Sequence, residues 1–447
     1  MNILILTWFF APANTIGAVR LGATAAGLRE HGHDVRVIAA RSGRYQETLP
    51  LPVPAESVHY TGWWDVNAAR DSFAIALRRL RRGTSRPPAA AVDAALPKAT
   101  GGPTAQASPG LARRFGARLS GLYVNLTNWP DWQIGWLPHV VREARTLIRD
   151  WRPDVVFASG PPFTTLLAGY VLCRRSGLPL VVEFRDRWSD DPYYPPPPWR
   201  HRIDAWGERR IVALAKGLVT VSEPWEEAFQ AKYGKPTVTI YNGYDNDFEP
   251  TPATSGANDV NFLKIRYLGH IYPGRRDPST LFAAMKLLDD APVKVRAEFY
   301  GTDAGQVWPL AEGHGVRHLV DVFPRVPYEQ SVALQRQADA LLLMQWNDPK
   351  EQGNVPGKFF EYLGARRPIV GLGYDEGVPA RLIRERGAGV YTNDPNDLAA
   401  TLAMWLETKH RQGHLPWLDA AACAGFSRGE QISRLNYFLE SLVVTGG

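Results

Sequence analysis

The chain has 447 residues, a hydrophobic content of 45%, a charged content of 21% and a net charge of +6. This length exceeds the capacity of one typical core, so we expect two globular domains. No run approaches the roughly 18 consecutive apolar residues of a membrane-spanning helix. With only Cys173 and Cys423, the chain has neither a disulfide framework nor a zinc cluster. Because the opening apolar run is short and has no basic leader, we expect a cytosolic protein.

Short apolar runs alternate with helical patterns along the chain, which is typical of α/β units with parallel sheets. The first half is expected to contribute strands at residues 3–6, 35–39, 155–158, 180–184 and 218–221. The second half is expected to contribute strands at 262–268, 297–300, 320–323, 340–344, 369–372 and 389–391. An Asn-Gly turn at residues 242–243 marks a junction. We therefore expect two doubly wound domains, 1–240 and 241–427, followed by a helix within 428–447.

The positive charge is concentrated between residues 78 and 118, where nine Lys or Arg accompany a single acid, Asp93. The flanks of this segment are typical of short basic amphipathic helices, and its Pro-, Ala- and Gly-rich middle predicts disorder. The segment either docks onto anionic lipid headgroups or a lipid-linked acceptor, or it is a solvated insertion. No recognition helix, zinc finger or RNP motif accompanies the charge, so we expect no nucleic-acid partner.

Ligands of doubly wound sheets bind beyond the carboxyl ends of the strands, so the residues there are candidates for a site. After the first strand, Gly17 opens a helix and lets a backbone approach a ligand closely. Arg185 and Asp186 follow the strand at 180–184, where charge is costly unless it is paired. The alternative for this second loop is a surface salt-bridge cluster.

The loop after residues 262–268 offers Gly269 for close approach. Arg275 or Arg276 in the same loop can grip a diphosphate with a planar guanidinium group. Ordinary loop arginines are the competing interpretation.

The segment 351–363, Glu-Gln-Gly-Asn-Val-Pro-Gly-Lys-Phe-Phe-Glu-Tyr-Leu, contains the strongest local signal. Pro356 is expected at the first position of a helix. The phenylalanines and the leucine then fall on one side, while Lys358 and Glu361 share the other. The helix N-terminus and Lys358 favour a phosphate, and Glu361 can accept hydrogen bonds from the two hydroxyls of a ribose. The alternative is an ordinary amphipathic helix with a surface ion pair.

Taken together, these residues resemble family 4 of the retaining glycosyltransferases, which have the GT-B fold. The resemblance rests on Phe10-Ala-Pro, Gly17, Gly32-His-Asp-Val35, Ser159-Gly-Pro-Pro162, Phe184-Arg-Asp186, Val221-Ser222, Asn242-Gly-Tyr-Asp245, Tyr267-Leu-Gly269 and residues 356–363. It implies two Rossmann-like domains facing each other across a cleft. The N-terminal domain would bind the acceptor and the C-terminal domain the nucleotide sugar, and the last helix would return to the first domain.

By this resemblance, Glu361 would bind the ribose of the donor. Arg276, or Arg275, would neutralise the leaving diphosphate, with Lys358 as a second cation. Gly17 would be the glycine near the phosphates.

The sequence departs from the family pattern at two places. The family commonly has a glutamate where this chain has Gly353, so Glu351, beside Asn354, is the candidate for contacting the donor sugar. The histidine that is common after the strand at 180–184 is replaced by Arg185 and Asp186. Asp186 is then expected to touch the donor sugar or the acceptor.

The implied activity is hexosyltransferase-like transfer, with retention, from a nucleoside diphosphate sugar to a hydroxyl of a cell-surface glycan or lipid-linked acceptor. UDP is the expected nucleotide, and neither a cofactor nor a metal is expected, although residues 245–247 form a DxD motif that binds metal in another glycosyltransferase fold. The enzyme is expected in the cytoplasm, peripheral to the inner face of the plasma membrane. The alternatives are transfer to a small secondary metabolite, a GT-B epimerase or hydrolase, and a non-catalytic membrane-docked scaffold.

Overall fold

The structure is a computed structural model that describes residues 1–68, 123–194, 196–245, 262–289, 294–444. The basic segment 78–118 and the second aspartate of the DxD motif, Asp247, therefore lie outside the described residues. The chain divides into two compact units. The first contains residues 1–221, 226–240 and 432–447, and the second contains residues 222–225 and 241–431.

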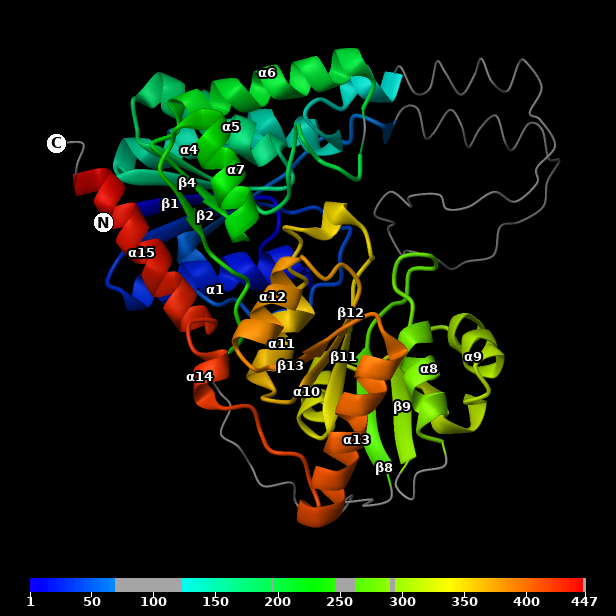
Figure 1. The fold of residues 1–447 in the computed structure, drawn as a ribbon. Helices are drawn as coiled ribbons and strands as arrows, with labels where there is room; N and C mark the ends of the chain where they lie inside the picture. Colours follow the sequence, from blue (N-terminus) through cyan, green and yellow to red (C-terminus); the bar gives the residue numbers. More distant parts are fainter. Residues whose placement is uncertain (69–122, 195, 246–261, 290–293, 445–447) are drawn as a thin grey trace, which may run out of the picture. The chain divides into compact units, whose positions relative to one another are not determined.

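The first unit is built around a parallel sheet in the order β3-β2-β1-β4-β5-β6-β7. Strands β1, β2 and β4 of this sheet are labelled in Figure 1. Its elements are β1 (Asn2–Thr7), α1 (Ile16–Glu30), β2 (Asp34–Ala40), η1 (Ala55–Ser57), β3 (Val58–Thr61), η2 (Trp132–Trp136), α4 (Leu137–Asp150), β4 (Val155–Gly160), α5 (Thr164–Ser176), β5 (Leu180–Phe184), α6 (Pro198–Leu214), β6 (Gly217–Thr220), α7 (Glu223–Tyr233), β7 (Thr237–Thr239) and α15 (Arg428–Val444). The first residues of α7 and of α15 are grouped with the second unit.

The second unit is built around a parallel sheet in the order β10-β9-β8-β11-β12-β13. Its elements are β8 (Phe262–Leu268), α8 (Ser279–Leu287), β9 (Lys294–Tyr300), α9 (Ala304–Gly313), η3 (Arg317–Leu319), β10 (Val320–Phe323), α10 (Tyr328–Arg336), β11 (Ala340–Met344), η4 (Pro349–Glu351), α11 (Gly357–Gly364), β12 (Ile369–Leu372), α12 (Val378–Glu385), β13 (Gly389–Tyr391), α13 (Pro395–Gln412) and α14 (Ala420–Cys423). The α/β fold class with two parallel sheets is confirmed.

All the expected strands are present, with ends that differ by a few residues. Two strands, β3 and β7, were not expected, and both lie at the edges of the first sheet. They are four and three residues long, which is too short for a clear alternation of apolar and polar side chains. Among the described residues, no helix is long and apolar enough to cross a membrane.

Both faces of the second sheet are covered by helices. Side chains of α8, α9 and α13 form one buried cluster with the strands, and side chains of α11, α12 and α14 form another. In the first unit, α1 packs against β1 and β2 and also against α15, through Ile432, Leu435 and Leu439. A Cβ at Gly27 of α1 would lie 2.7 Å from Ile432 Cδ1, so this glycine permits the close approach of the two helices.

A buried ion pair joins α1 to the centre of the first sheet. Arg20 donates to Glu183 Oε1 from Nη2 at 2.7 Å and from Nε at 3.1 Å, and to the carbonyl of Ile240 at 2.8 Å. The hydroxyl of Ser159 on β4 also donates to Glu183. Burial opposes ionisation of Glu183, but the charges of Arg20 and Arg185 outweigh it and lower the pKa of this carboxyl group. The pair thus fixes α1, β4 and β5 around one charge.

Removing the carboxylate of this pair should destabilise the first unit strongly. Glu183→Ala leaves Arg20 buried without its partner, so we expect a loss of about 3 kcal/mol in the free energy of unfolding. Urea unfolding followed by circular dichroism measures the loss. The matched control is Glu407→Ala, which removes an exposed pair with Arg411 at 4.0 Å and should change stability by less than about 0.5 kcal/mol. Equal effects of the two substitutions would contradict this interpretation.

Candidate functional site

The charged candidates lie at the carboxyl ends of strands where the strand order reverses direction. In the second sheet this point lies between β8 and β11, and in the first sheet it lies between β1 and β4. Loops that follow the two central strands diverge at such a point and leave a crevice where ligands bind. The loop after β8 and the segment between β11 and α11 carry most of the residues that the sequence singles out.

Helix α11 begins at Gly357, and Pro356 is its N-cap rather than its first helical residue. The expected position of Pro356 was therefore wrong by one residue, because its backbone is extended, with φ −67° and ψ 142°. Its carbonyl accepts a hydrogen bond from the amide of Phe359 at 3.0 Å. The apolar side of the helix is buried as expected, with Phe359, Phe360 and Leu363 almost inaccessible to solvent.

Lys358 lies against the backbone of Gly269, at the end of β8. A Cβ at Gly269 would lie 1.7 Å from Lys358 Nζ, and the φ of Gly269 is +146°, so a larger residue would displace the lysine. The ammonium group lies 4.5 Å from the ring centroid of Tyr267. Within the part of the chain that the structure describes, no hydrogen bond or ion pair from this ammonium group is present.

Arg276 lies beside Lys358 and shares its surroundings. Its Nη1 donates to the carbonyl of His270 at 3.2 Å, and the hydroxyl of Tyr267 donates to the same carbonyl at 2.8 Å. Arg275 instead extends over the ring of Trp346, with its Cζ 4.8 Å from the ring centroid. The geometry thus places Arg276, rather than Arg275, next to the lysine.

Burial and, to a smaller extent, the neighbouring positive charge of Arg276 lower the pKa of Lys358 to about 8. Glu361, one turn along α11, opposes this shift. Two neighbouring cations that form no ion pair among the described residues, next to a helix start, are suited to an anion that carries more than one negative charge.

Glu361 lines a pocket of about 300 Å³ in the second unit. One of its carboxylate oxygens accepts a hydrogen bond from Gln335 Nε2 at 3.0 Å. Tyr328 and Gln335 of α10 line the same pocket, together with Tyr244, Asp245, Glu329, Val332, Arg336, Gly364, Ala365 and Arg428. The carboxylate is thus oriented by α10 and retains lone pairs for a ligand in the pocket.

Glu351 is buried, and two amides orient it. Asn354 Nδ2 donates to its carboxylate at 2.7 Å, and Gln345 Nε2 approaches the same oxygen at 3.4 Å. Gln345 also donates to the carbonyl of Asn354 at 2.9 Å. At Gly353 a Cβ would lie 2.2 Å from Nε1 of Trp225, so the space next to this position is already filled.

In the first unit, Gly17 and Arg185 lie in contact. A Cβ at Gly17 would lie 2.7 Å from Arg185 Nη1. The guanidinium group donates to the carbonyl of Pro161, and the backbone amide of Arg185 donates to the carbonyl of Gly160 at 2.8 Å. Burial lowers the pKa of Arg185, and the charges of Glu183 and Asp186 oppose this shift. The glycine therefore provides the space that the arginine occupies.

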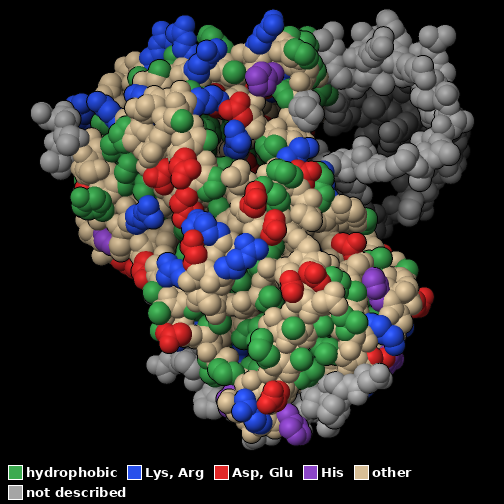
Figure 2. Space-filling model, viewed as in Figure 1, with side chains coloured by type: hydrophobic (Ala, Val, Ile, Leu, Met, Phe, Trp, Pro, Cys, Tyr) green, Lys and Arg blue, Asp and Glu red, His purple; other side chains and the backbone are tan. Residues whose placement is uncertain are grey.

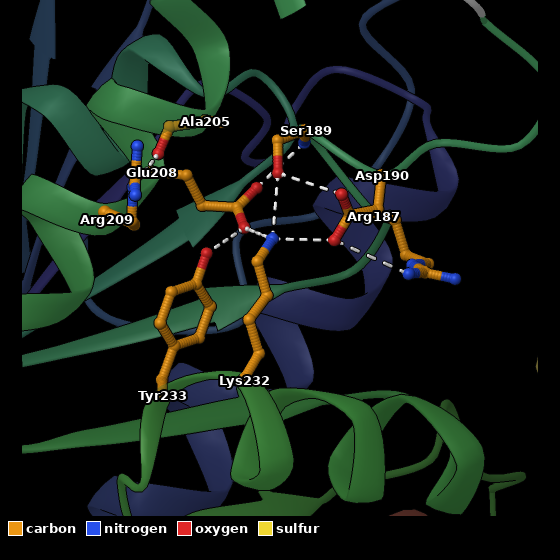
Figure 3. Close-up of polar contacts among 8 residues, drawn as sticks. All are labelled: Arg187, Ser189, Asp190, Ala205, Glu208, Arg209, Lys232 and Tyr233. Atoms are coloured by element: carbon orange, nitrogen blue, oxygen red, sulfur yellow. Dashed lines mark hydrogen bonds and ion pairs between the residues drawn. The ribbon is translucent and has the colours of Figure 1, made fainter. Parts of the chain in front are cut away.

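The loop after Arg185 is anchored by a charged network (Figure 3). The Lys232 ammonium contacts Glu208 at 2.8 Å and Asp190 at 2.6 Å, and donates to the hydroxyl of Ser189 at 3.0 Å. Glu208 accepts further hydrogen bonds from the backbone amide of Ser189, at 2.8 Å, and from the hydroxyl of Tyr233. These contacts hold the loop between α6 and α7.

Asp186 lies on this anchored loop with its side chain exposed. Desolvation by the surrounding protein raises the pKa of Asp186. The positive charge of Arg185 opposes this rise, and the negative charge of Asp191 adds to it. Because the loop is fixed at both flanks, the carboxylate has a defined position from which to contact a ligand.

Among the described residues, no group of three or more His, Cys, Asp or Glu is arranged to hold a metal ion. Asp245, the first residue of the DxD motif, forms an ion pair with Arg428.

The structure brings the predicted residues together in three groups. In the second unit, Gly269, Arg276 and Lys358 adjoin Glu361, while Glu351, Gly353 and Asn354 form a separate turn before α11. In the first unit, Gly17, Arg185 and Asp186 form the third group.

Sequence reasoning missed three residues that support these groups. They are Tyr267, Gln335 and Gln345, which lie against Lys358, Glu361 and Glu351 respectively. Tyr267 is part of the quoted motif Tyr267-Leu-Gly269, although no role was predicted for its side chain, and no local pattern distinguishes the two glutamines from ordinary polar residues.

Comparisons with known proteins agree with this fold. Residues 104–248 match the family model described as Glycosyltransferase Family 4. No curated protein matches the sequence. Solved structures match over almost the whole chain, and we describe three of them. HepE from Anabaena, in complex with UDP-glucose, is 13% identical with a TM-score of 0.54, covering 99% of this chain and 100% of HepE.

A glycosyltransferase from Rickettsia africae is 11% identical with a TM-score of 0.56, covering 100% of this chain and 99% of the other. The lipopolysaccharide outer core galactosyltransferase WaaB, in its apo form, is 11% identical with a TM-score of 0.55, and 99% of each chain is covered. At these identities the likeness shows the fold, and the expected GT-B fold is confirmed.

The unusual environment of Lys358 can be measured directly. We expect this lysine to titrate near pH 8, and Arg276→Gln to raise its pKa, because the substitution removes a neighbouring positive charge. The pH dependence of Lys358 acetylation, followed by mass spectrometry of its peptide, gives the value. Arg275→Gln is the matched control and should leave the pKa unchanged, since Arg275 extends over Trp346. A value near the ordinary 10.5 in the unmodified protein would contradict the described geometry.

Proposed function

We propose that the chain is a glycosyltransferase of the family 4 type and that it transfers a sugar from a nucleoside diphosphate sugar to a hydroxyl group, with retention at the anomeric carbon; the partial match to the family model and the GT-B fold support this proposal. The observation that carries this proposal is the position of the Lys358 ammonium group. It lies beside Arg276 without an ion pair among the described residues, and Glu361 follows one helical turn later at a pocket of about 300 Å³. That volume is at the lower end of the range for small-molecule sites.

We propose that the diphosphate binds against Lys358, Arg276 and the backbone of Gly269. A departing diphosphate gains negative charge as the glycosidic bond breaks, and fixed cations stabilise that charge more in the transition state than in the ground state. The absence of a side chain at Gly269 leaves room for both the lysine and the phosphates. Arg276 supplies a planar guanidinium that can hold two phosphate oxygens at once.

The ribose is assigned to Glu361. Its carboxylate can accept from two vicinal hydroxyls while Gln335 holds it in place. UDP is the proposed nucleotide, and the complex of HepE with UDP-glucose supports this choice. The donor is proposed to be a UDP-hexose.

The donor sugar is assigned to Glu351. This chain has a glycine at the position of the family glutamate, and Glu351 is the buried carboxylate in the same turn. Asn354 and Gln345 orient it, so that little side-chain entropy is lost when it accepts a sugar hydroxyl.

The acceptor is proposed to be a glycan or a lipid-linked oligosaccharide, bound by the first unit near Asp186. The likeness to the galactosyltransferase WaaB, which acts on a lipopolysaccharide outer core, supports this class. The developing oxocarbenium ion would need no covalent nucleophile, and the departing phosphate would take the acceptor proton on the same face. We propose that the enzyme works in the cytoplasm, peripheral to the inner face of the plasma membrane.

Incubation with a panel of nucleotide sugars, with and without membrane extract and with excess EDTA, tests this function. We expect transfer of a hexose from a UDP-sugar that depends on the extract and is undiminished by EDTA. Mass spectrometry identifies the product. Turnover without extract would identify an epimerase or hydrolase, no turnover of any donor would favour a scaffold, and loss in EDTA would exclude the metal-independent mechanism.

Glu361→Ala should lower kcat/KM by roughly 50-fold, equivalent to about 2–3 kcal/mol, because it deletes a charged group that hydrogen-bonds the ribose. Steady-state kinetics with the identified donor give the value. The matched control is Glu329→Ala, which removes another carboxylate from the same pocket but lies on α10. If both variants keep full activity, Glu361 is not the ribose ligand.

A further inference from the structure

The outward face of α6 combines arginine with large apolar side chains. The inward residues of this helix are buried, namely Arg200, Asp204, Gly207, Glu208, Ile211 and Val212. Between them, Arg202, Ile203, Trp206, Arg209 and Arg210 are exposed, and we call these five residues the α6 face. Ile203 is 40% exposed and Trp206 is 51% exposed. A helix of a globular protein ordinarily turns such side chains inward.

The α6 face is strongly positive because the acids of the helix point the other way. Asp204 pairs with Arg200 at 3.0 Å, and Glu208 pairs with Lys232 at 2.8 Å. The outward arginines form no ion pair with any carboxylate in the described parts of the chain.

The neighbouring helix α5, which packs against α6, is also positively charged. It contains no acidic residue and exposes Arg174 and Arg175 in its last turn. Figure 2 shows Lys and Arg side chains gathered along the edge of the first unit that α6 forms. The surface therefore complements an extended negative charge.

Trp206 is supported from within the fold while part of its ring stays accessible. Its ring packs on that of Trp129, with centroids 6.3 Å apart and planes tilted by 41°. The guanidinium of Arg210 lies 5.5 Å from the Trp206 centroid. The indole is thus held in one orientation between the half-buried Trp129 and Arg210, beside the exposed Ile203.

We propose that the α6 face docks the protein onto an anionic lipid bilayer. Arginine side chains there bind lipid phosphates, and the indole and the isoleucine enter the headgroup region, where amphipathic rings and aliphatic side chains are favoured. A nucleic acid would also complement the charge of the arginines, but it would offer no apolar surroundings for the exposed side chain of Ile203. The surface lies outside the proposed donor and acceptor residues, and it differs from the basic segment 78–118.

Co-sedimentation of the full chain with phosphatidylcholine vesicles, with and without 30% phosphatidylglycerol, tests the proposal. We expect binding to the anionic vesicles alone, weakened by 0.5 M NaCl. Since each arginine near such a surface contributes roughly fivefold in binding, the triple variant R202E/R209E/R210E should bind at least 50-fold less. Trp206→Ala should reduce binding by roughly tenfold, because it removes the largest apolar contact.

The matched control changes the same net charge elsewhere. Lys286→Glu, Arg411→Glu and Arg434→Glu reverse three exposed cations on α8, α13 and α15, and their combination should bind the anionic vesicles nearly as well as the unmodified protein. Thermal unfolding and far-UV circular dichroism verify that each variant is folded.

Several results would overturn the proposal. They are equal binding by the two triple variants, equal binding to neutral and anionic vesicles, and binding of a single-stranded oligonucleotide in place of vesicles. The outcome is independent of sugar transfer, because the vesicle assay contains no donor. Failure of the docking proposal would therefore leave the proposed activity standing, and the reverse also holds.

Discussion

The proposed donor site depends on one electrostatic constraint, the half-buried ammonium group of Lys358. Burial and Arg276 both disfavour its positive charge, and no ion pair with a carboxylate relieves it in the described ranges. The fold tolerates this arrangement because Phe359, Phe360 and Leu363 anchor α11 in the core and Gly269 leaves space for the lysine. An anion bound at this point would pair with both cations and would thereby offset the cost of holding them close together.

In the first unit, by contrast, buried charges are paired within the protein. Glu183 is fully surrounded by donors from Arg20 and Ser159, and its charge is neutralised inside the fold. The network around Lys232 and Glu208 does the same for the loop that carries Asp186. These satisfied networks fix backbone positions, whereas Lys358 and Arg276 form no ion pair in the described ranges and are proposed to bind a ligand. The contrast separates supporting residues from candidate binding residues.

Much of the fold followed from local patterns. The expected strands were recognised because parallel strands are buried on both faces and form continuous apolar runs. Strands β3 and β7 were not predicted because they are short and lie at the edges of the sheet. The apolar side of α11 was correct in every residue, while its first residue was not, since the extended backbone of Pro356 caps the helix. Helix ends depend on a few dihedral angles, and packing decides them as much as composition does.

The sequence by itself determined the two parallel sheets, the apolar side of α11 and the placement of Lys358 and Glu361 one helical turn apart. These features repeat with the period of a strand or a helix, so neighbouring residues specify them. Only the tertiary structure decided that Arg276 rather than Arg275 adjoins the lysine, that Gln335 orients Glu361, and that the arginines of α6 face outward without acids. Such contacts join residues that are distant in the chain, and side-chain packing, which has no sequence period, selects them.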